Sequence, residues 1–368
     1  MASAAENLVR FDASNYICSV LGGLQNDFFS RRHPETFWED LIRVAAKQLV
    51  LPTLYSRLQA LKWLENAPPE IAEFLRSVQE LNFERNVRIL AEVAAAAKLL
   101  NDIGIEPVVL KGVAYLITDV YEQNGTRFLS DIDFLVAEPN FESAFKVFAD
   151  VGFKCYQTTR IQRVVYHAAP LSRSESVNID LHRILGVSHC DSLLPAFEIE
   201  KDSVPYRLVD ATVRIPSPEH LIMHHIIHSQ IHHGHRERIW FSMRTMYDFL
   251  LLQRRFRGSI DWKFVERRFR QNGQYGVLAM YLLYMENELG VPSPIPIHLS
   301  CLNRLRWYRS NLMRTAPSLR FIDPIYMINS CGLHRATHLI NILRVPGGQR
   351  YLIEKLWKKA FTAGCLRP

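Results

Sequence analysis

Three acidic residues near the middle of the chain have the types and the spacing to hold a divalent cation. Asp131 and Asp133 alternate within RFLSDIDFLV at residues 127–136, and Asp180 lies within VNIDLH at residues 177–182. Alternate residues of a strand point to the same face, so the first two carboxylates would project together. Neighbouring carboxylates repel each other, and Mg²⁺, a hard cation that prefers oxygen ligands, relieves the repulsion. We therefore predict a metal site formed by Asp131, Asp133 and Asp180.

An alternative is that these aspartates are ordinary surface residues of strands. The apolar residues beside the pair in FLSDIDFLV predict a core strand, in which an unpaired carboxylate pair would be costly to bury. Asp180 also lies in an apolar strand-like run, as a third ligand or as the general base for an acceptor hydroxyl.

Basic and polar residues near the aspartates are candidates for holding phosphate oxygens. Lys111 and Gly112 end a short apolar run and precede a segment predicted to be helical, whose first backbone amides would favour an anion. Arg127 would neutralise phosphate charge, and Ser130 would cap the turn or contact phosphate. His182 follows the third aspartate by two residues and should share its face, where it would contact substrate, orient that aspartate, or be structural.

These fragments together resemble the nucleotidyltransferase superfamily of the polymerase-β type, and more closely a poorly characterised bacterial branch of it. Members of that branch have Leu-Lys-Gly, an arginine shortly before Asp-Ile-Asp-Leu-Leu-Val, and then Asp-Leu-His. The matching positions here are 110–112, Arg127, 131–136 and 180–182. The superfamily usually has Gly-Ser in its first turn, where this chain has Lys-Gly, so a lysine point charge stands in for the serine.

The resemblance implies a transferase that depends on Mg²⁺ or Mn²⁺. Asp131 and Asp133 would hold two metal ions that bridge the donor phosphates, and Asp180 would bind one ion and activate the acceptor. A nucleoside monophosphate would move from a nucleoside triphosphate to a hydroxyl or phosphate of a peptide, small molecule or RNA. Two alternatives stay open. One is glycosyl transfer from a nucleotide-sugar to a phosphorylated acceptor, and the other is a non-catalytic module that binds a nucleotide, RNA or a partner protein.

Four histidines, His220, His224, His228 and His232, recur every four residues and form one stripe along a predicted helix. This spacing also suits zinc, but no accompanying carboxylate-plus-two-histidine signature is present. The resembling branch has a histidine near the position of His228 and a later aspartate that matches Asp248. We therefore favour a helix that faces the active cleft or a domain interface, with His228 as a substrate-binding candidate.

Composition limits the class of protein. The chain has 368 residues, of which 48% are hydrophobic and 22% charged, as in globular proteins of two or three domains. Its sequence has no apolar run of the roughly 18 residues that a membrane span needs, and the first residues do not have the pattern of a signal peptide. The six cysteines are scattered, which is typical of reduced thiols. We expect a cytoplasmic protein.

Positive charge gathers in the C-terminal third. From Arg236 onwards the chain has 22 Lys and Arg against 8 Asp and Glu, whereas the preceding residues have 22 against 29. Such a distribution suits an anionic acceptor such as a phosphopeptide or RNA, and it also suits a basic solvated surface. The mixed basic and apolar segment at 335–361 permits contact with a membrane surface.

The pattern of elements predicts an α+β fold with a mixed-sheet core of the nucleotidyltransferase type, flanked by helical regions. We divide the chain into an N-terminal helical region (1–105), a catalytic core (106–216) and a basic C-terminal helical domain (217–368). The predicted core strands are 107–112, 126–136, 153–157, 163–169, 177–184 and 212–216. Helices are predicted at 113–122 and 140–152 within the core and at 68–104 before it, and a Pro-rich linker is predicted at 291–299.

Overall fold

A mixed β-sheet forms the centre of the part of the chain that the computed structural model describes, which is residues 13–24, 33–155, 168–185, 192–232 and 242–315. Seven strands lie in the order β3-β4-β5-β2-β1-β7-β6. Their bounds are β1 Val108–Val109, β2 Asp131–Leu135, β3 Lys154–Cys155, β4 Ala168–Ser172, β5 Asn178–His182, β6 Val204–Leu208 and β7 Ala211–Ile215. The pairs β2/β5 and β1/β7 are parallel and the other neighbours are antiparallel. The predicted α+β class is confirmed.

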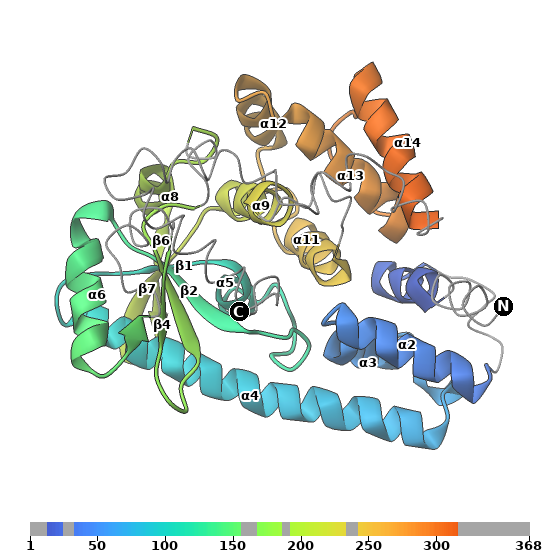
Figure 1. Ribbon diagram of the computed structural model, residues 1–368, viewed down its shortest axis with the longest axis horizontal. Coiled ribbons are helices and arrows are strands. Elements are labelled where there is room, and N and C mark those ends of the chain that lie inside the picture. Colours follow the sequence, from blue (N-terminus) through green and yellow to red (C-terminus); the bar gives the residue numbers. More distant parts are fainter. Residues whose placement is uncertain (1–12, 25–32, 156–167, 186–191, 233–241, 316–368) are drawn as a thin grey trace, which may run out of the picture.

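Some helices, such as α4 and α6, lie beside the sheet, and others form a second, all-helical part of the molecule (Figure 1). Residues 13–22 are helical. The others are α2 Glu35–Lys47, α3 Leu51–Ala60, α4 Pro69–Asn101, α5 Lys111–Ile117, α6 Phe141–Asp150, α8 Ala196–Asp202, α9 Pro218–Ile226, α11 Met243–Arg255, α12 Trp262–Gln271, α13 Tyr275–Leu289 and α14 Cys301–Thr315, with 3-10 turns at Leu64–Asn66 and Glu138–Asn140 and a π-helical turn at Ile227–His232.

The helices from the two ends of the chain pack against each other. Gly22 lies so close to the backbone of Leu289, at the end of α13, that a Cβ at residue 22 would overlap it. The amide of Met243, at the start of α11, donates to the side-chain oxygen of Gln48, which follows α2, at 3.1 Å. Two helical regions far apart in the sequence therefore build one helical half, which lies toward the N-terminal end of α4, whereas the strands lie toward its C-terminal end (Figure 1).

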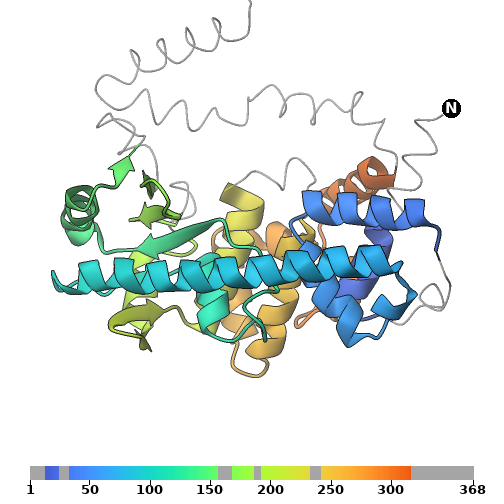
Figure 2. The same ribbon diagram turned by 90° about the horizontal axis from the view of Figure 1, so that it is seen from below.

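The long helix α4 links this helical half to the sheet (Figures 1 and 2). It is 33 residues long and contacts α3, α6 and β7. Near its end, Asn101 exchanges hydrogen bonds with the backbone of Thr212 on β7, at 2.7 and 3.0 Å. About two and a half turns earlier in α4, Glu92 accepts a hydrogen bond from the amide of Val177 at 2.8 Å, just before β5. Polar side chains of α4 thus fix both β7 and β5.

The sequence predicted a strand that begins at residue 126, but β2 begins at Asp131. Side chains of α4 explain the difference. Asn82 donates to the carbonyl oxygens of Gly125 and Arg127, and Asn86 donates to that of Arg127. Arg85 donates to the carbonyl of Leu129. These carbonyls are occupied by helix side chains instead of a neighbouring strand, so residues 125–129 form a loop that α4 holds.

Other elements differ from the predictions in extent. The predicted helix at 113–122 begins at Lys111 and ends at Ile117. Neither β6 nor α14 was predicted. The Pro-rich segment at 291–299 has no helix or strand, as expected. The basic segment at 335–361 lies outside the described residues.

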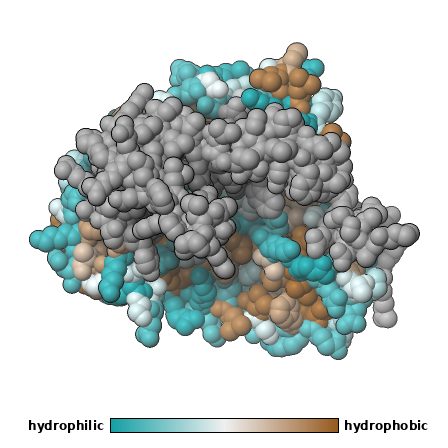
Figure 3. Space-filling view, in the orientation of Figure 1, coloured by the Kyte–Doolittle hydropathy of each residue, from teal (hydrophilic) through white to brown (hydrophobic). Residues whose placement is uncertain are grey.

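Hydrophobic and hydrophilic residues are interspersed on the visible surface, with a hydrophobic patch over α14 at the top of Figure 3. Leu302, Leu305 and Tyr308 of that helix are exposed. Among the described residues, no helix combines the length and the apolar character needed to cross a bilayer. Cys18, Cys155 and Cys301 are free thiols, and the other cysteines lie outside the described part of the chain.

Candidate active site

The sheet brings two of the predicted aspartates side by side. In the parallel pair β2/β5, Asp133 lies opposite Asp180, and His182 follows on the same strand as the latter. One potential ligand atom from each of these three residues lies within 4.8 Å of the others. Ile132 and Phe134, which point to the opposite face of β2, are fully buried. The apolar face of the strand therefore anchors it in the core and holds the carboxylate in place.

Asp133 is buried and has two polar partners. Its Oδ1 accepts a hydrogen bond from Lys111 Nζ at 2.6 Å and lies 2.8 Å from His182 Nε2. Burial alone would raise the pKa of Asp133, but the Lys111 ammonium and the His182 ring outweigh it and hold that pKa below its ordinary value. Because an ionised carboxylate only accepts hydrogen bonds, Nε2 of His182 carries a proton.

Asp180 has the opposite balance. It is half-buried and forms no ion pair within the described residues. Burial raises its pKa, and the negative charge of Asp133 raises it further. A cation beside these two carboxylates would offset both effects.

Asp131 and Ser130 lie at the start of β2. Asp131 is half-buried, pairs with Asn178 in the register and accepts a hydrogen bond from the exposed Ser130 hydroxyl at 2.7 Å. It is not among the three residues whose ligand atoms gather within 4.8 Å, although its charge contributes to the raised pKa of Asp180. Asp131 therefore interacts electrostatically with Asp180 but does not belong to the cluster of Asp133, Asp180 and His182.

The turn that carries Lys111 is strained and tightly packed. Lys111 has a φ of 49°, in the left-handed region that non-glycine residues rarely adopt. The following Gly112 is buried, and a Cβ there would overlap the guanidinium of Arg127 and the side chain of Leu129. The backbone strain brings the lysine side chain to Asp133, and the glycine lets the loop before β2 approach α5.

Arg127 has different contacts from those expected of a phosphate ligand. Its guanidinium forms a bidentate pair with Asp248 on α11, with distances of 2.8 Å from Nε and 2.9 Å from Nη2 to the two carboxylate oxygens. Asp248 also accepts from the Tyr121 hydroxyl at 2.6 Å. Burial would lower the pKa of Arg127, but Asp248 more than compensates and raises it. The arginine thus joins the loop before β2 to the helical half.

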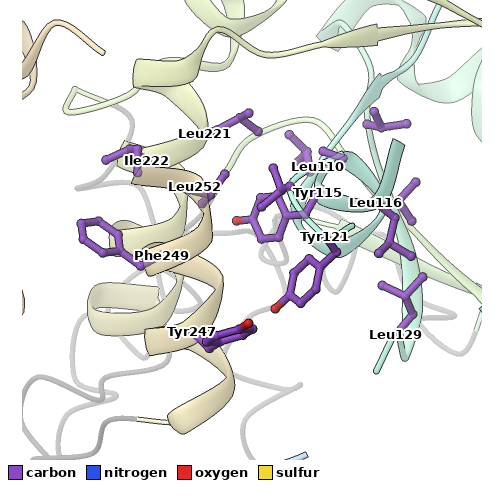
Figure 4. Packing of buried hydrophobic residues seen from close by; sticks show 14 of the residues in the cluster. Leu110, Tyr115, Leu116, Tyr121, Leu129, Leu221, Ile222, Tyr247, Phe249 and Leu252 are labelled. Carbon is purple, nitrogen blue, oxygen red and sulfur yellow. The ribbon is translucent and has the colours of Figure 1, made fainter. Parts of the chain in front are cut away.

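Apolar packing around this ion pair fixes α5 against α9 and α11 (Figure 4). Tyr115 and Tyr121 project from α5 and the turn after it toward Leu221 of α9 and toward Tyr247 and Leu252 of α11, and all five are buried. The helical half therefore forms one wall beside the strands that carry the aspartates.

Two histidines of the predicted stripe, His224 and His228, lie on this wall. His224 is buried, and its Nε2 has no hydrogen-bond partner in the described part of the molecule. Burial lowers the pKa of His224, and the charges of Lys111 and His182 lower it further. The ring of His228, which is half-buried on the π-helical turn, lies 5.9 Å from that of His224. The ring of His224 therefore lies within the electrostatic influence of Lys111 and His182. We did not select His224 from the sequence, although the four-residue spacing pointed to its face.

Two further arginines near the site were not predicted from the sequence. Arg85 of α4 and Arg244 of α11 both act electrostatically on Asp131. Nothing in their local sequence distinguishes them from surface cations, because their position depends on how two distant helices pack.

The donor set fits a divalent cation. Asp133 and Asp180 offer oxygen atoms, which hard cations such as Mg²⁺ and Mn²⁺ prefer, whereas the ring nitrogen of His182 better suits transition metals. That ring already donates to Asp133. The two carboxylates would therefore hold the ion, and His182 would orient one of them.

A family described as uncharacterised nucleotidyltransferase matches residues 34–289, which is more than half of the chain. The chain belongs to this family. The resemblance drawn from the Lys-Gly, Asp-x-Asp and Asp-Leu-His fragments is thus confirmed, and the family match extends beyond them into the helices on both sides.

A crystal structure of an antigenic nucleotidyltransferase-like protein from Paracoccidioides brasiliensis is similar at 13% sequence identity, with a TM-score of 0.34, over 55% of this chain and 93% of the other. No curated protein matches the chain significantly.

Proposed function

We propose that this member of the family is a metal-dependent nucleotidyltransferase that transfers a nucleoside monophosphate from a nucleoside triphosphate to an acceptor hydroxyl or phosphate. The observation that carries the proposal is the register of β2 and β5, which sets Asp133 opposite Asp180. The cation would be Mg²⁺ or Mn²⁺, because the paired groups are carboxylates.

Each residue has a role that follows from its contacts. Lys111 and His182 keep Asp133 ionised and fixed, ready to contribute an oxygen to the cation. Asp180 contributes a second oxygen to the cation and accepts the proton of the acceptor. When bound, the cation supplies charge stabilisation to the phosphate oxygens.

The reaction balances in one displacement. The acceptor oxygen forms a bond to the α-phosphorus while the bond from that phosphorus to the bridging oxygen breaks. Pyrophosphate leaves with the electron pair of the broken bond, and the acceptor proton passes to the Asp180 carboxylate. Because phosphoryl-type transfer depends mainly on positioning and charge, the buried and hydrogen-bonded carboxylate suits this chemistry.

The test is calorimetric titration of the full chain with ATP, GTP, CTP and UTP, each with and without Mg²⁺. Asp180→Asn is the informative variant, because Asp180 is half-buried and forms no ion pair with any residue that the structure describes, whereas loss of the buried Asp133 would leave Lys111 without its carboxylate partner. We expect the metal-dependent part of binding by the preferred nucleotide to fall about tenfold or more, equivalent to about 1.4 kcal/mol.

Asp210→Asn is the matched control, since Asp210 is an exposed aspartate between β6 and β7, at the far edge of the same sheet. It should bind as the wild type does. Wild-type protein that binds no nucleotide in the presence of Mg²⁺, or an Asp180→Asn variant that binds as tightly as the control, would contradict the proposal.

A further inference from the structure

Both cations that the sequence offered for phosphate binding are engaged within the protein. Lys111 pairs with Asp133, and Arg127 pairs with Asp248. The Ser130 hydroxyl donates to Asp131. A triphosphate donor carries several negative charges, so it needs positive groups beyond these.

Two other arginines lie beside the start of β2. Arg85 is half-buried on α4; its Nη1 donates to the carbonyl of Leu129, and its guanidinium lies over the Phe128 ring, 4.6 Å from the ring centre. One N–H therefore fixes the group, and the ring supports its flat face.

Arg244 lies on α11 one helical turn before Asp248, whose carboxylate pairs with Arg127 of the loop before β2. It is half-buried, and its Nε is buried without a hydrogen-bond partner in the described part of the chain. An unsatisfied buried donor on a charged group is costly, which is unusual unless a ligand completes it.

Neither arginine forms an ion pair within the described residues, although both feel the charge of Asp131. Their strongest charged neighbours are other cations, Arg88 for Arg85 and Arg127 for Arg244. Arg85 and Arg244 therefore bring two guanidinium groups without a carboxylate partner in the described part of the chain close to Asp131, two residues along the strand from Asp133. An anion bound there would pair with these guanidinium groups and lie beside the acidic pair.

We propose that Arg85 and Arg244 form a polyphosphate-binding subsite next to Asp131, built by α4 and α11 together. Guanidinium groups match phosphate oxygens with two parallel N–H donors each, and the ligand would be the terminal phosphates of the donor. This inference rests on the proposed function, because it assigns part of the donor to the same site. The contact between Arg85 of α4 and the carbonyl of Leu129 in the loop before β2 would then help to position this guanidinium for the phosphates.

The test measures binding of inorganic tripolyphosphate without metal to the full chain, by calorimetry. We expect Arg85→Gln and Arg244→Gln each to weaken binding about tenfold. Arg76→Gln on α4 and Arg254→Gln on α11 are matched controls, since both residues are exposed and Arg76 pairs with Glu73 and Glu80. These controls should bind within about twofold of wild type.

A second measurement uses wild-type protein alone, in case a variant does not fold. Arginines are modified with phenylglyoxal with and without tripolyphosphate, and the modified positions are mapped by mass spectrometry. Protection of Arg85 and Arg244, but not of Arg76 and Arg254, is expected. Equal modification of Arg85 and Arg244 with and without the anion would overturn the subsite.

The subsite and the proposed function fail separately. Arg85→Gln and Arg244→Gln that bind tripolyphosphate as wild type does, or wild type that does not bind it, overturn the subsite even if Asp180→Asn abolishes metal-dependent nucleotide binding. Tripolyphosphate binding that needs both arginines supports the subsite even if no nucleoside triphosphate binds with Mg²⁺.

Discussion

Asp133 and Asp180 occupy matching positions on parallel strands, yet their surroundings move their pKa values in opposite directions. Asp133 has a lysine and a histidine within 2.8 Å, whereas Asp180 has the charge of Asp133 beside it and no cation in contact within the described residues. Acid–base roles separate where environments drive two pKa values apart. We therefore propose Asp133, which Lys111 and His182 hold in place, as the fixed ligand and Asp180 as the proton acceptor.

His225 gives the first prediction at the scale of single residues. Tyr281 donates to the Thr245 carbonyl, so its oxygen accepts from His225 Nε2 at 3.0 Å, and the Tyr115 hydroxyl lies 3.1 Å from His225 Nδ1. Burial lowers the pKa of His225 from 6.5 to about 4, so the ring is neutral at pH 7. Between pH 6.5 and pH 4 the unfolded chain binds a proton that the folded chain does not, so this histidine makes folding less favourable as the pH falls through that window.

We expect the free energy of unfolding of wild type, relative to His225→Gln, to fall by about 1–3 kcal/mol between pH 7 and pH 4.5. Urea titrations at several pH values measure it. His298→Gln, at an exposed position, is the control and should leave the pH dependence unchanged. The same pH dependence in wild type and His225→Gln would contradict the assignment.

At this scale the sequence predicted that carboxylates would gather on one face of a strand, but it did not predict most of the contacts that the neighbouring arginines make. Alternation in Asp-Ile-Asp, with apolar flanks, correctly indicated a core strand with its carboxylates on one face. The pairing of Arg127 with Asp248 joins residues 121 positions apart, so no local pattern could reveal it. The resemblance did single out Asp248, but without a role. Arg85 and Arg244 had no signal, because their place depends on helix packing.

At the scale of elements, the Arg127–Asp248 pair connects the loop before β2 to α11, and it is buried, with side chains 8% and 2% exposed. Removing one partner leaves the other charge buried and unpaired. We expect Asp248→Asn to lower the free energy of unfolding by about 3–5 kcal/mol. Because Arg127→Gln removes the same interaction, the double variant should be more stable than the two single losses predict, by about 1–3 kcal/mol.

Urea denaturation of the single and double variants forms the cycle that measures this coupling. The pair between Arg183 and Glu138 is the control, because the Glu138 side chain is 63% exposed, and its cycle should give about 0–1 kcal/mol. Additive losses for Arg127→Gln and Asp248→Asn would show that the pair does not tie the loop to α11.

The elements themselves were partly predictable. The long helix at 68–104 and the change from helical to strand periodicity near residue 106 were visible, and they are confirmed by α4 and β1. The early part of the predicted strand at 126–136 was wrong, because Asn82, Asn86 and Arg85 take carbonyls that a strand would have offered to a neighbour. Such competition from side chains of a distant helix leaves no periodic pattern in the loop.

At the scale of the whole molecule, the boundaries expected at residues 105 and 216 do not divide the core. One hydrophobic cluster includes Trp38 of α2, Ile132 of β2 and Leu252 of α11. Separating the central segment would expose the wall in Figure 4, where Tyr115 and Tyr121 meet α9 and α11. A region that buries its apolar surface only against its neighbours gains little stability alone.

We therefore predict that the described regions unfold as one cooperative unit. Native-state hydrogen exchange measures this, because amides of α2, β5 and α11 should converge on a common free energy of opening as urea is added. The physical reason is that α4 fixes β5 and β7 while its other end contacts α3, so the sheet and the helical half cannot separate without exposing both. Amides of α2 that open at a free energy several kcal/mol below those of β5 would show instead that the N-terminal helices unfold as an independent unit.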